Sequence, residues 1–271
     1  MATLAQRRPL AAVTGASSGI GFELGRQFAE RGYDLVVCAE DSRIHDAAHA
    51  FECEGVRVHA VQVDLRRPEG VETFYEAIEA EGSPLLEAIA LNAGVGVLGD
   101  FARETDLREE LALIQLNVVS VVHLAKLAAR DMVARGQGRI LITASVAGTM
   151  PTPKTAVYGA TKAFDLSFAA SLRHELRDTG VTVTALIPGP TDTDFFAREG
   201  ASDTKAAEIA ERNDPADVAR QAFEALMAGK DRVYGATSIA TRLQGMASRF
   251  TPESVKAAQH EKMSEHGSRS K

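Results

Sequence analysis

Short apolar segments alternate with segments of helical periodicity along most of this chain. The segment "PLAAVTGA" (9–16) stops in a Gly/Ser cluster, and "IGFELGRQFAERG" (20–32) follows it with apolar residues at helical spacing. The same order of strand and helix then recurs. Further strands are predicted at 34–39, 56–63, 86–92, 138–145, 181–189 and, more weakly, 231–236, and further helices at about 42–54, 68–81, 106–135 and 157–178.

This alternation predicts an α/β fold with a doubly wound parallel sheet of about seven strands and helices on both faces. Ligands of such sheets bind beyond the carboxyl ends of the strands, so functional residues are expected just after strands. The chain contains no internal repeat or long linker, and we expect a single domain over 1–271. Within it we expect a cofactor and catalytic core at about 9–190, a substrate lid at about 191–213 and a C-terminal extension at about 238–271.

Composition narrows the class of protein further. Hydrophobic residues make up 45% of the 271 residues, which is enough for a buried core. The net charge of -7 and the pI near 5.6 disfavour nucleic acid and anionic membranes as partners. Uninterrupted apolar runs stay well below the roughly 20 residues of a membrane helix. Two cysteines, Cys38 and Cys53, are too few for a disulfide framework, and with no recognisable secretion leader we expect a cytoplasmic protein.

A glycine-rich turn joins the first predicted strand to the first predicted helix. In "TGASSGIG" (14–21), Gly15 permits a sharp turn, Gly19 permits close approach of a pyrophosphate, and Gly21 permits close packing of the helix. The helix amides would bind phosphate oxygens, as in a Rossmann-type dinucleotide site. A plain glycine-rich turn is the alternative. The expected cofactor contacts in this turn are Gly15, Ser17, Ser18, Gly19, Ile20 and Gly21.

Acidic residues after the second and third strands bear on the choice of cofactor. Glu40 and Asp41 would accept hydrogen bonds from the adenosine ribose and repel a 2′-phosphate, which favours NAD over NADP. Arg43 argues the other way, and both acids could simply form an exposed first helical turn. Asp64, followed by Leu65, is expected to contact the adenine, although Asp64 could equally be an N-cap of the next helix.

A second group of residues suggests acid/base chemistry. Tyr158 and Lys162 are four positions apart on a predicted helix and share one face. A nearby ammonium lowers the pKa of a phenol from its usual value near 10, which makes tyrosine a usable acid or base. Ser145, at the end of the fifth strand, could polarise a carbonyl oxygen. Taken singly, the three residues would be read as a packing tyrosine, a solvated lysine and a turn serine.

These motifs, in this order, resemble the short-chain dehydrogenase/reductase family over roughly residues 9–190. "TGASSGIG" resembles the family's cofactor turn, and "YGATK" resembles its catalytic Y-x-x-x-K with Ser145 thirteen residues upstream. The family's N-N-A-G is "LNAG" (91–94) here, with Leu91 in place of the first asparagine. Further residues fall on family positions: Asn117 on the fourth catalytic position, Asn92, Ala93 and Gly94 against the cofactor, and Pro188, Gly189, Thr191 and Thr193 around the nicotinamide amide.

The resemblance implies hydride transfer between a nicotinamide and a carbonyl or alcohol carbon. Tyr158 would exchange the hydroxyl proton while Ser145 holds the substrate oxygen. Lys162 would lower the pKa of Tyr158 and bind the nicotinamide ribose, and Asn117 would hold a water that connects Lys162 to solvent. For Asn117 alone, a helix kink or a buried polar contact is an alternative. A non-catalytic nucleotide-binding scaffold and a methyltransferase are the competing functions.

Three further expectations concern the substrate, the assembly and metals. Phe195 and Phe196, at the start of the predicted lid, favour an apolar substrate, although core contacts would explain them equally well. Apolar residues beyond a single stripe on the helices at 106–135 and 157–178 hint at a second buried face, and family members pair these helices, so we expect a homotetramer or homodimer. No metal is expected. His45 and His49 are spaced for one, but no convincing third ligand joins them.

Overall fold

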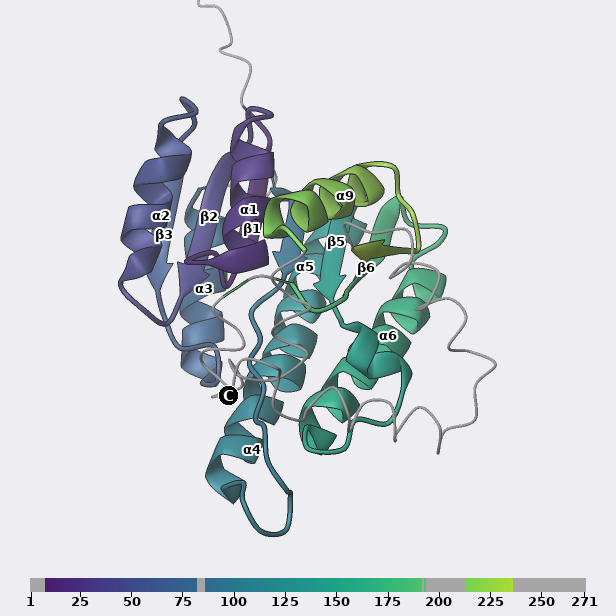
Figure 1. Cartoon of the computed structure of the whole chain (residues 1–271). Helices are drawn as coiled ribbons and strands as arrows, with labels where there is room; N and C mark the ends of the chain where they lie inside the picture. The colour runs from purple at the N-terminus through teal and green to yellow at the C-terminus, as the bar shows by residue number, and fades with distance from the viewer. Residues whose placement is uncertain (1–7, 82–85, 192, 194–212, 236–271) are drawn as a thin grey trace, which may run out of the picture.

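The computed structural model describes residues 8–81, 86–191, 193 and 213–235 of the chain. Seven parallel strands form one sheet in the order β3-β2-β1-β4-β5-β6-β7, which Figure 1 shows at the centre of the molecule. The strands are β1 (Leu10–Thr14), β2 (Asp34–Ala39), β3 (Val58–Gln62), β4 (Leu86–Leu91), β5 (Gly138–Thr143), β6 (Val181–Pro188) and β7 (Arg232–Gly235).

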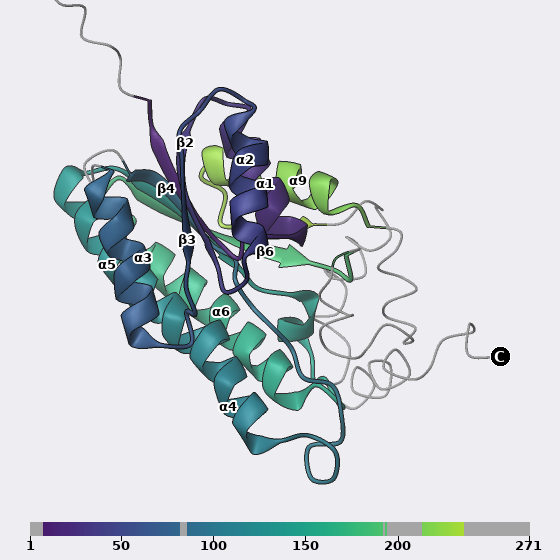
Figure 2. The ribbon, with the colours of Figure 1, turned by 90° about the vertical axis from the view of Figure 1, so that its left-hand side faces the viewer.

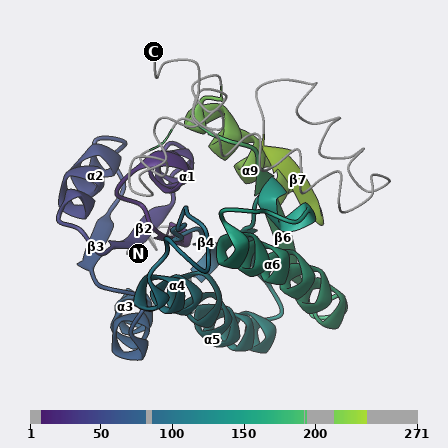
Figure 3. The ribbon, with the colours of Figure 1, turned by 60° about the horizontal axis from the view of Figure 1, so that its bottom comes forward.

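Helices cover both faces of the sheet, as Figure 3 shows in a view along the strands. One face carries α1 (Gly19–Ala29), α2 (Arg43–Glu52) and α9 (Pro215–Met227). The other carries α3 (Pro68–Ala80), α5 (Ser120–Arg135) and α6 (Ala156–Glu175), and α4 (Leu107–Ile114) extends beyond the sheet and packs against α6. The predicted doubly wound α/β fold with seven strands is confirmed.

Alternate residues of the central strands fill two separate cores. In β1, Leu10 and Ala12 pack into the core under α3, α5 and α6, whereas Ala11 and Val13 pack into the core under α1, α2 and α9. All five β1 residues are buried. A strand buried on both faces has to be apolar at every position, which explains the continuous apolar run in the sequence.

The predicted helix at 106–135 is one long helix with an irregular centre. Figure 2 shows α4 and α5 in line, next to α6. Between them, residues Gln115–Val119 form a π-helical turn, η2, in which the hydrogen bonds reach one residue further along the chain. Within the described ranges, Leu107–Arg135 is the one helix long and apolar enough to cross a membrane. Part of that apolarity belongs to the core, since one side of α5 packs on the sheet.

The sequence analysis named no helix between 213 and 231, where the structure has α9. The signals for it were present. Asp214 caps the helix by accepting a hydrogen bond from the backbone N–H of Ala216 at 2.8 Å, and Pro215 occupies the first helical position. The weak strand predicted at 231–236 is β7, which pairs in parallel with β6 at the edge of the sheet.

Candidate active site

The turn after β1 brings three backbone segments into close contact. Gly15 has φ +67°, a left-handed conformation that is costly for residues with a side chain. A Cβ atom there would lie 2.9 Å from the Cα atom of Ala93. A Cβ atom on Gly21 would overlap the carbonyl oxygen of Gly15, because the start of α1 packs directly on the turn. The geometry therefore requires glycine at both positions.

The first turn of α1 is suited to an anion. Ser18 is its N-cap residue, and within the described residues the Ser18 side chain makes no capping hydrogen bond. The turn holds no acidic side chain and begins at Gly19 and Ile20. Gly19 faces Thr193, whose Cγ2 atom would lie 2.9 Å from a Cβ atom at position 19. Backbone amides at such a helix end bind phosphate, so these residues fit the pyrophosphate of a dinucleotide.

A threonine at the end of β1 supports the segment "LNAG". Thr14 Oγ1 accepts hydrogen bonds from the backbone amides of Asn92, at 2.9 Å, and Ala93, at 3.0 Å. The side chain of Asn92 adds two hydrogen bonds. Its Nδ2 donates to the backbone carbonyl of Thr14 at 3.3 Å, and its Oδ1 accepts from the hydroxyl of Thr143 at 3.2 Å. Leu91 is the buried last residue of β4. The segment is thus held between β1 and β5 even with leucine at position 91.

An ion-pair network lies at the carboxyl ends of β2 and β3. Arg66 donates to Glu40 at 2.8 Å and to Asp64 at 2.8 Å. Partial burial acts to raise the pKa of Asp64, but the hydrogen bonds from Arg66 outweigh it and hold that pKa below its ordinary value. The alternative that Asp64 is the N-cap of the next helix is wrong, because that position belongs to Arg67. Leu65 is buried.

A second acid and base pair follows β2 directly. Arg43 donates to Asp41 from its backbone amide and its guanidinium, both at 3.1 Å. Ser17, from the glycine turn, donates to the same carboxylate at 3.2 Å. Hydrogen bonds from Arg43 are the main reason that the pKa of Asp41 lies below its ordinary value. The carboxylate therefore stays ionised at neutral pH, beside the glycine turn.

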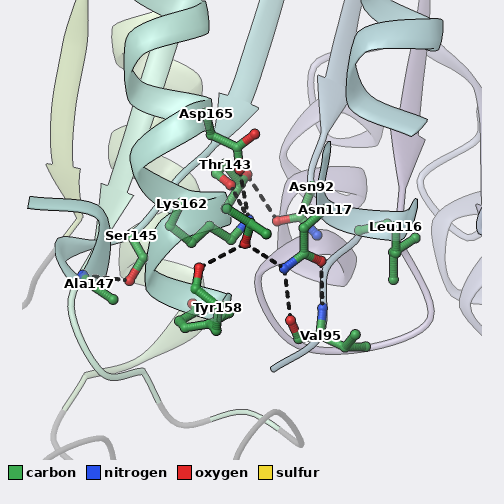
Figure 4. A network of polar contacts seen from close by, with 12 residues as sticks. Asn92, Val95, Leu116, Asn117, Thr143, Ser145, Ala147, Tyr158, Lys162 and Asp165 are labelled. Carbon is green, nitrogen blue, oxygen red and sulfur yellow. Dashed lines mark hydrogen bonds and ion pairs between the residues drawn. The ribbon is translucent and has the colours of Figure 1, made fainter. Parts of the chain in front are cut away.

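Lys162 and Asn117, two residues of the predicted catalytic set, are buried and held by several hydrogen bonds (Figure 4). Lys162 Nζ donates to the backbone carbonyl of Thr143 at 2.8 Å and to Asp165 Oδ2 at 3.1 Å. Asn117 lies in the π-helical turn, where its side chain accepts from the backbone N–H of Val95 at 3.0 Å and donates to the Val95 carbonyl at 2.9 Å. Both alternatives for Asn117, a helix irregularity and a buried polar contact, therefore occur.

Serine and tyrosine complete the set. β5 ends at Thr143, so Ser145 lies just beyond the strand that was predicted to include it. It caps the short 3-10 helix η3 (Val146–Thr149), and its Oγ accepts from the backbone N–H of Ala147 at 3.1 Å. Tyr158 is half-buried near the start of α6. In Figure 4, Ser145, Tyr158 and Lys162 are drawn in one close view at the carboxyl end of β5.

Gly94 connects the glycine-turn half of the site to the Lys162 half. A Cβ atom on Gly94 would lie 3.3 Å from Asn117 Oδ1 and 3.4 Å from Lys162 Nζ. The segment "LNAG" therefore runs from the support of Thr14 at one end to the ammonium of Lys162 at the other. The structure thus brings the predicted cofactor segment and the predicted catalytic lysine together.

The residues after β6 lie at the same edge of the sheet. Pro188 is the last residue of β6, and the Gly189 amide donates to the carbonyl of Gly235 at 3.2 Å. Thr191 is buried and donates from its hydroxyl to the Gly189 carbonyl at 2.9 Å. Thr193 lies against the glycine turn, at Gly19. This segment therefore closes over the first turn of α1.

The profile of the family described as short chain dehydrogenase matches residues 9–204 of this chain. That range contains the glycine turn, the segment "LNAG" and the set of Ser145, Tyr158 and Lys162. The chain belongs to the short-chain dehydrogenase family. It is a nicotinamide-dependent oxidoreductase that acts on a small-molecule substrate.

Named and solved short-chain dehydrogenases are similar to this chain over most of its length. A 1-deoxy-11-beta-hydroxypentalenate dehydrogenase from Streptomyces exfoliatus is 35% identical over 228 residues, or 83% of this chain and 81% of the relative. A short-chain dehydrogenase from Sphingobium yanoikuyae in complex with NADPH has a TM-score of 0.79 and 30% identity, and the match covers 89% of this chain and 93% of the other. Another, from Burkholderia phymatum in complex with NAD, has a TM-score of 0.77 and 25% identity, with 90% and 96% covered.

Several predicted features fall outside this site or outside the described residues. Phe195, Phe196 and the extension after 238 lie outside the described ranges. His49 binds Glu52 at 3.1 Å, and Cys53 donates to the backbone carbonyl of His49. Among the residues that the structure describes, no three His, Cys, Asp or Glu side chains form a group that could hold a metal ion.

Sequence reasoning missed four residues that shape the site. Thr14 could have been found as the polar residue at the end of an apolar strand, and Arg66 as the cation two positions after Asp64. Asp165 lies three positions after Lys162 on the same helix, a spacing that predicts contact. Thr143 carries no comparable signal, because its backbone carbonyl is what binds Lys162.

Proposed function

We propose that this enzyme transfers a hydride between a nicotinamide cofactor and a carbonyl or secondary alcohol carbon, with Tyr158 as general acid and base. The observation that carries the proposal is the buried ammonium of Lys162, anchored on Thr143 at the end of β5 and adjacent to Gly94. Tyr158 precedes Lys162 by one helical turn on α6. An ammonium in that position favours the phenolate, which lets Tyr158 take up and release the substrate proton.

The remaining residues of the site have distinct tasks in this proposal. A nicotinamide cofactor bound along the glycine turn supplies or accepts the hydride. Ser145 donates a hydrogen bond to the substrate oxygen and so stabilises the negative charge that develops there during reduction. Asn117 fixes the backbone of Val95, and with it the segment "LNAG" that faces the cofactor. Lys162 holds the cofactor ribose.

We propose NAD as the preferred cofactor. Three carboxylates lie at the ends of β2 and β3, and they already hold two guanidinium groups in ion pairs, while the charge of Arg67 acts on Asp64 as well. An added 2′-phosphate would be repelled there, and it would have to take an arginine from its carboxylate partner. The carboxylates are Glu40, Asp41 and Asp64, and the guanidinium groups are Arg43 and Arg66. Similar proteins have been solved with NADPH and with NAD.

We propose an apolar substrate of small to medium size. The Streptomyces exfoliatus relative is named as the dehydrogenase of a hydroxylated compound, 1-deoxy-11-beta-hydroxypentalenate, which supports alcohol and carbonyl chemistry here. Phe195 and Phe196 in the sequence after β6 support an apolar pocket. The alternative, a non-catalytic nucleotide-binding scaffold, has no use for a lysine buried beside a tyrosine on α6.

We propose a homo-oligomer in which the outer faces of α4, α5 and α6 pair between subunits. Large apolar side chains are exposed on these helices, and Phe164 stacks on Phe168 with ring centroids 5.6 Å apart. Several large apolar side chains exposed on neighbouring helices are typical of an interface. The large exposed apolar residues are Leu107, Leu111, Val122, Val133 and Phe164 on the three helices and Val119 in η2, between α4 and α5.

A binding titration and a turnover assay test the proposed function. Binding of NADH, NADPH and S-adenosylmethionine is measured by fluorescence and calorimetry, and turnover is then measured with a panel of ketones and aldehydes. We expect NADH to bind most tightly and apolar ketones or aldehydes to be reduced. Tighter binding of S-adenosylmethionine would contradict the nicotinamide site, and tight NADH binding without turnover of any carbonyl would favour the scaffold.

A further inference from the structure

The ammonium of Lys162 has two anchors, and one of them is a carboxylate with no contact to solvent. Lys162 Nζ lies 2.8 Å from the Thr143 carbonyl and 3.1 Å from Asp165 Oδ2. The Asp165 side chain is 0% exposed and that of Lys162 is 6% exposed. Within the described residues, Asp165 Oδ1 has no hydrogen-bond partner. A buried carboxylate with an unsatisfied oxygen is costly, so its position next to the catalytic lysine calls for an explanation.

Lys162 lies between Tyr158 and Asp165 along α6. The three residues are at i, i+4 and i+7 of one helix, so their side chains follow one face. Asp165 is therefore separated from Tyr158 by about 10 Å along the helix axis, with Lys162 between them. The carboxylate acts on the phenol mainly through the lysine.

The hydrogen bonds of Lys162 determine the direction in which its remaining N–H group points. An ammonium group has three N–H donors and no acceptor. Thr143 takes one of the donors and Asp165 takes another, which leaves the third for the side of the site that Tyr158 and Gly94 occupy. We propose that Asp165 is a positioning residue that keeps Lys162 charged and aims its third N–H at Tyr158 and the cofactor ribose. The proposal rests on the proposed function, since it gives Asp165 a task in that chemistry.

The surroundings act on the charge of Asp165 in two opposite directions. Burial raises the pKa of Asp165 above its ordinary value, and the charge of Lys162 acts in the opposite direction. On the elements around α6, the other charged or titratable groups are exposed or have partners elsewhere, apart from Glu110 on α4, which is buried, and His123 on α5, which is half-buried. The exposed groups are Arg108 and Glu109 on α4 and Lys126 and Arg130 on α5. The groups with partners elsewhere are Asp131, which accepts from Tyr75, Arg135, which donates to the Leu86 carbonyl, and Arg139 on β5, which pairs with Glu87, whereas β6, η2 and η3 contain no charged residue.

A purely structural role for Asp165 makes a different prediction from the positioning role. If Asp165 only filled space and balanced charge, its replacement would change stability and would change cofactor binding equally at every pH. If it keeps Lys162 protonated, replacement makes cofactor binding depend on pH. The pH dependence therefore separates the two roles.

The test uses two variants of the full chain and one control. Asp165→Asn keeps the size and one hydrogen-bond acceptor but removes the charge, and Asp165→Leu removes both. Glu175→Gln removes one negative charge from an exposed position near the end of the same helix. NADH affinity is measured by fluorescence titration at pH 6 and pH 9, and the pH profile of kcat/KM is measured with a ketone or aldehyde that the wild type reduces.

We expect the wild type and Glu175→Gln to bind NADH almost equally at both pH values. For Asp165→Asn we expect the Kd to rise about tenfold between pH 6 and pH 9, the size of one charge-assisted hydrogen bond, because the unpaired ammonium loses its proton in that range. In the pH profile of kcat/KM, the limb that reflects ionisation of Tyr158 should move to higher pH, because a neutral amine at Lys162 no longer favours the phenolate. Asp165→Leu should show the same two changes if the variant folds. If Asp165→Leu does not fold, the result for Asp165→Asn alone decides the test.

Two results would overturn the positioning role. One is an Asp165→Asn variant whose NADH affinity and kcat/KM profile follow those of the wild type at every pH. The other is a shift of the Tyr158 limb to lower pH, which would mean that Asp165 weakens the effect of Lys162. The NADH titration needs no turnover, so an enzyme that reduced none of the tested carbonyls would refute the proposed function while this test still applied.

Discussion

Glu40 and Arg66 form an ion pair of 2.8 Å at the carboxyl ends of β2 and β3, where the adenosine of a dinucleotide binds in this fold. Arg66 is thereby paired with a carboxylate, and the Glu40 carboxylate lies next to the expected ribose. Discrimination between NAD and NADP therefore depends on Glu40 in this account.

Replacement of Glu40 by Ala should shift the preference toward NADPH. The change removes a repelling charge and one of the two carboxylate partners of Arg66, so that an N–H group of Arg66 can bind a 2′-phosphate. We therefore expect the ratio of NADPH to NADH affinity to rise about tenfold or more. Fluorescence titration at low and physiological salt measures the ratio. The control is Asp231→Asn, at the residue directly before β7, and it should leave the ratio unchanged. An unchanged ratio in Glu40→Ala would show that discrimination lies elsewhere.

Replacement of Thr14 by Val should destabilise the fold and weaken cofactor binding together. Valine has the shape of threonine but leaves the amides of Asn92 and Ala93 without their acceptor. Two partly buried donors without an acceptor cost about 2 kcal/mol of unfolding free energy. Urea denaturation measures the loss, and Thr14→Ser, which keeps the hydroxyl, should recover most of it. Equal stability of the valine and serine variants would contradict the role of this hydroxyl.

The pKa of Tyr33 predicts how stability falls in alkali. Burial, reinforced by a hydrogen bond to Glu87, raises the pKa of Tyr33 to about 12. The unfolded phenol titrates near 10, so the folded state holds its proton longer, and stability is lost as pH rises from about 10 to about 12. Between pH 8 and pH 11, Tyr33→Phe should lose less unfolding free energy than the wild type, as measured by urea denaturation. A parallel loss in both proteins would contradict the shift.

Charge on the outer faces of α5 and α6 should disrupt the proposed oligomer. Val122→Glu or Phe164→Glu places a carboxylate where the interface would bury apolar surface, at a site that tolerates charge in the monomer because it is partly exposed. Light scattering after gel filtration should show a smaller particle than the wild type, with circular dichroism unchanged. A wild type that is already monomeric would contradict this interface.

Much of the fold was predictable because strands buried on both faces must be apolar throughout. The run "PLAAVTGA" and its equivalents therefore indicated the parallel strands, and the glycine turn indicated where the first helix begins. By contrast, α9 was not predicted although Asp214 and Pro215 mark its start, because the sequence before them has no clear periodicity. Asp64 was read as a possible helix cap, but the helix begins later, after Arg67.

The support of the site was harder to predict than its reactive groups. Tyr158, Lys162 and Ser145 belong to a recognisable spacing, whereas Thr14 acts across strands through its side chain and Thr143 through its backbone carbonyl. Contacts of this kind depend on the register between β1, β4 and β5, which no local pattern encodes. Asn117 shows the same limit, because its bonds join the π-helical turn to Val95, 22 positions earlier in the chain.

The most direct test of the account is the replacement of Tyr158 by Phe, which removes a single hydroxyl. With NADH and a ketone or aldehyde that the wild type reduces, kcat/KM should fall by about a hundredfold or more, the contribution of a general acid, while the Kd of NADH stays within about threefold. Tyr234→Phe, in β7, is the matched control and should retain activity. Turnover by Tyr158→Phe at a rate close to that of the wild type would contradict the assignment of Tyr158 as the proton donor.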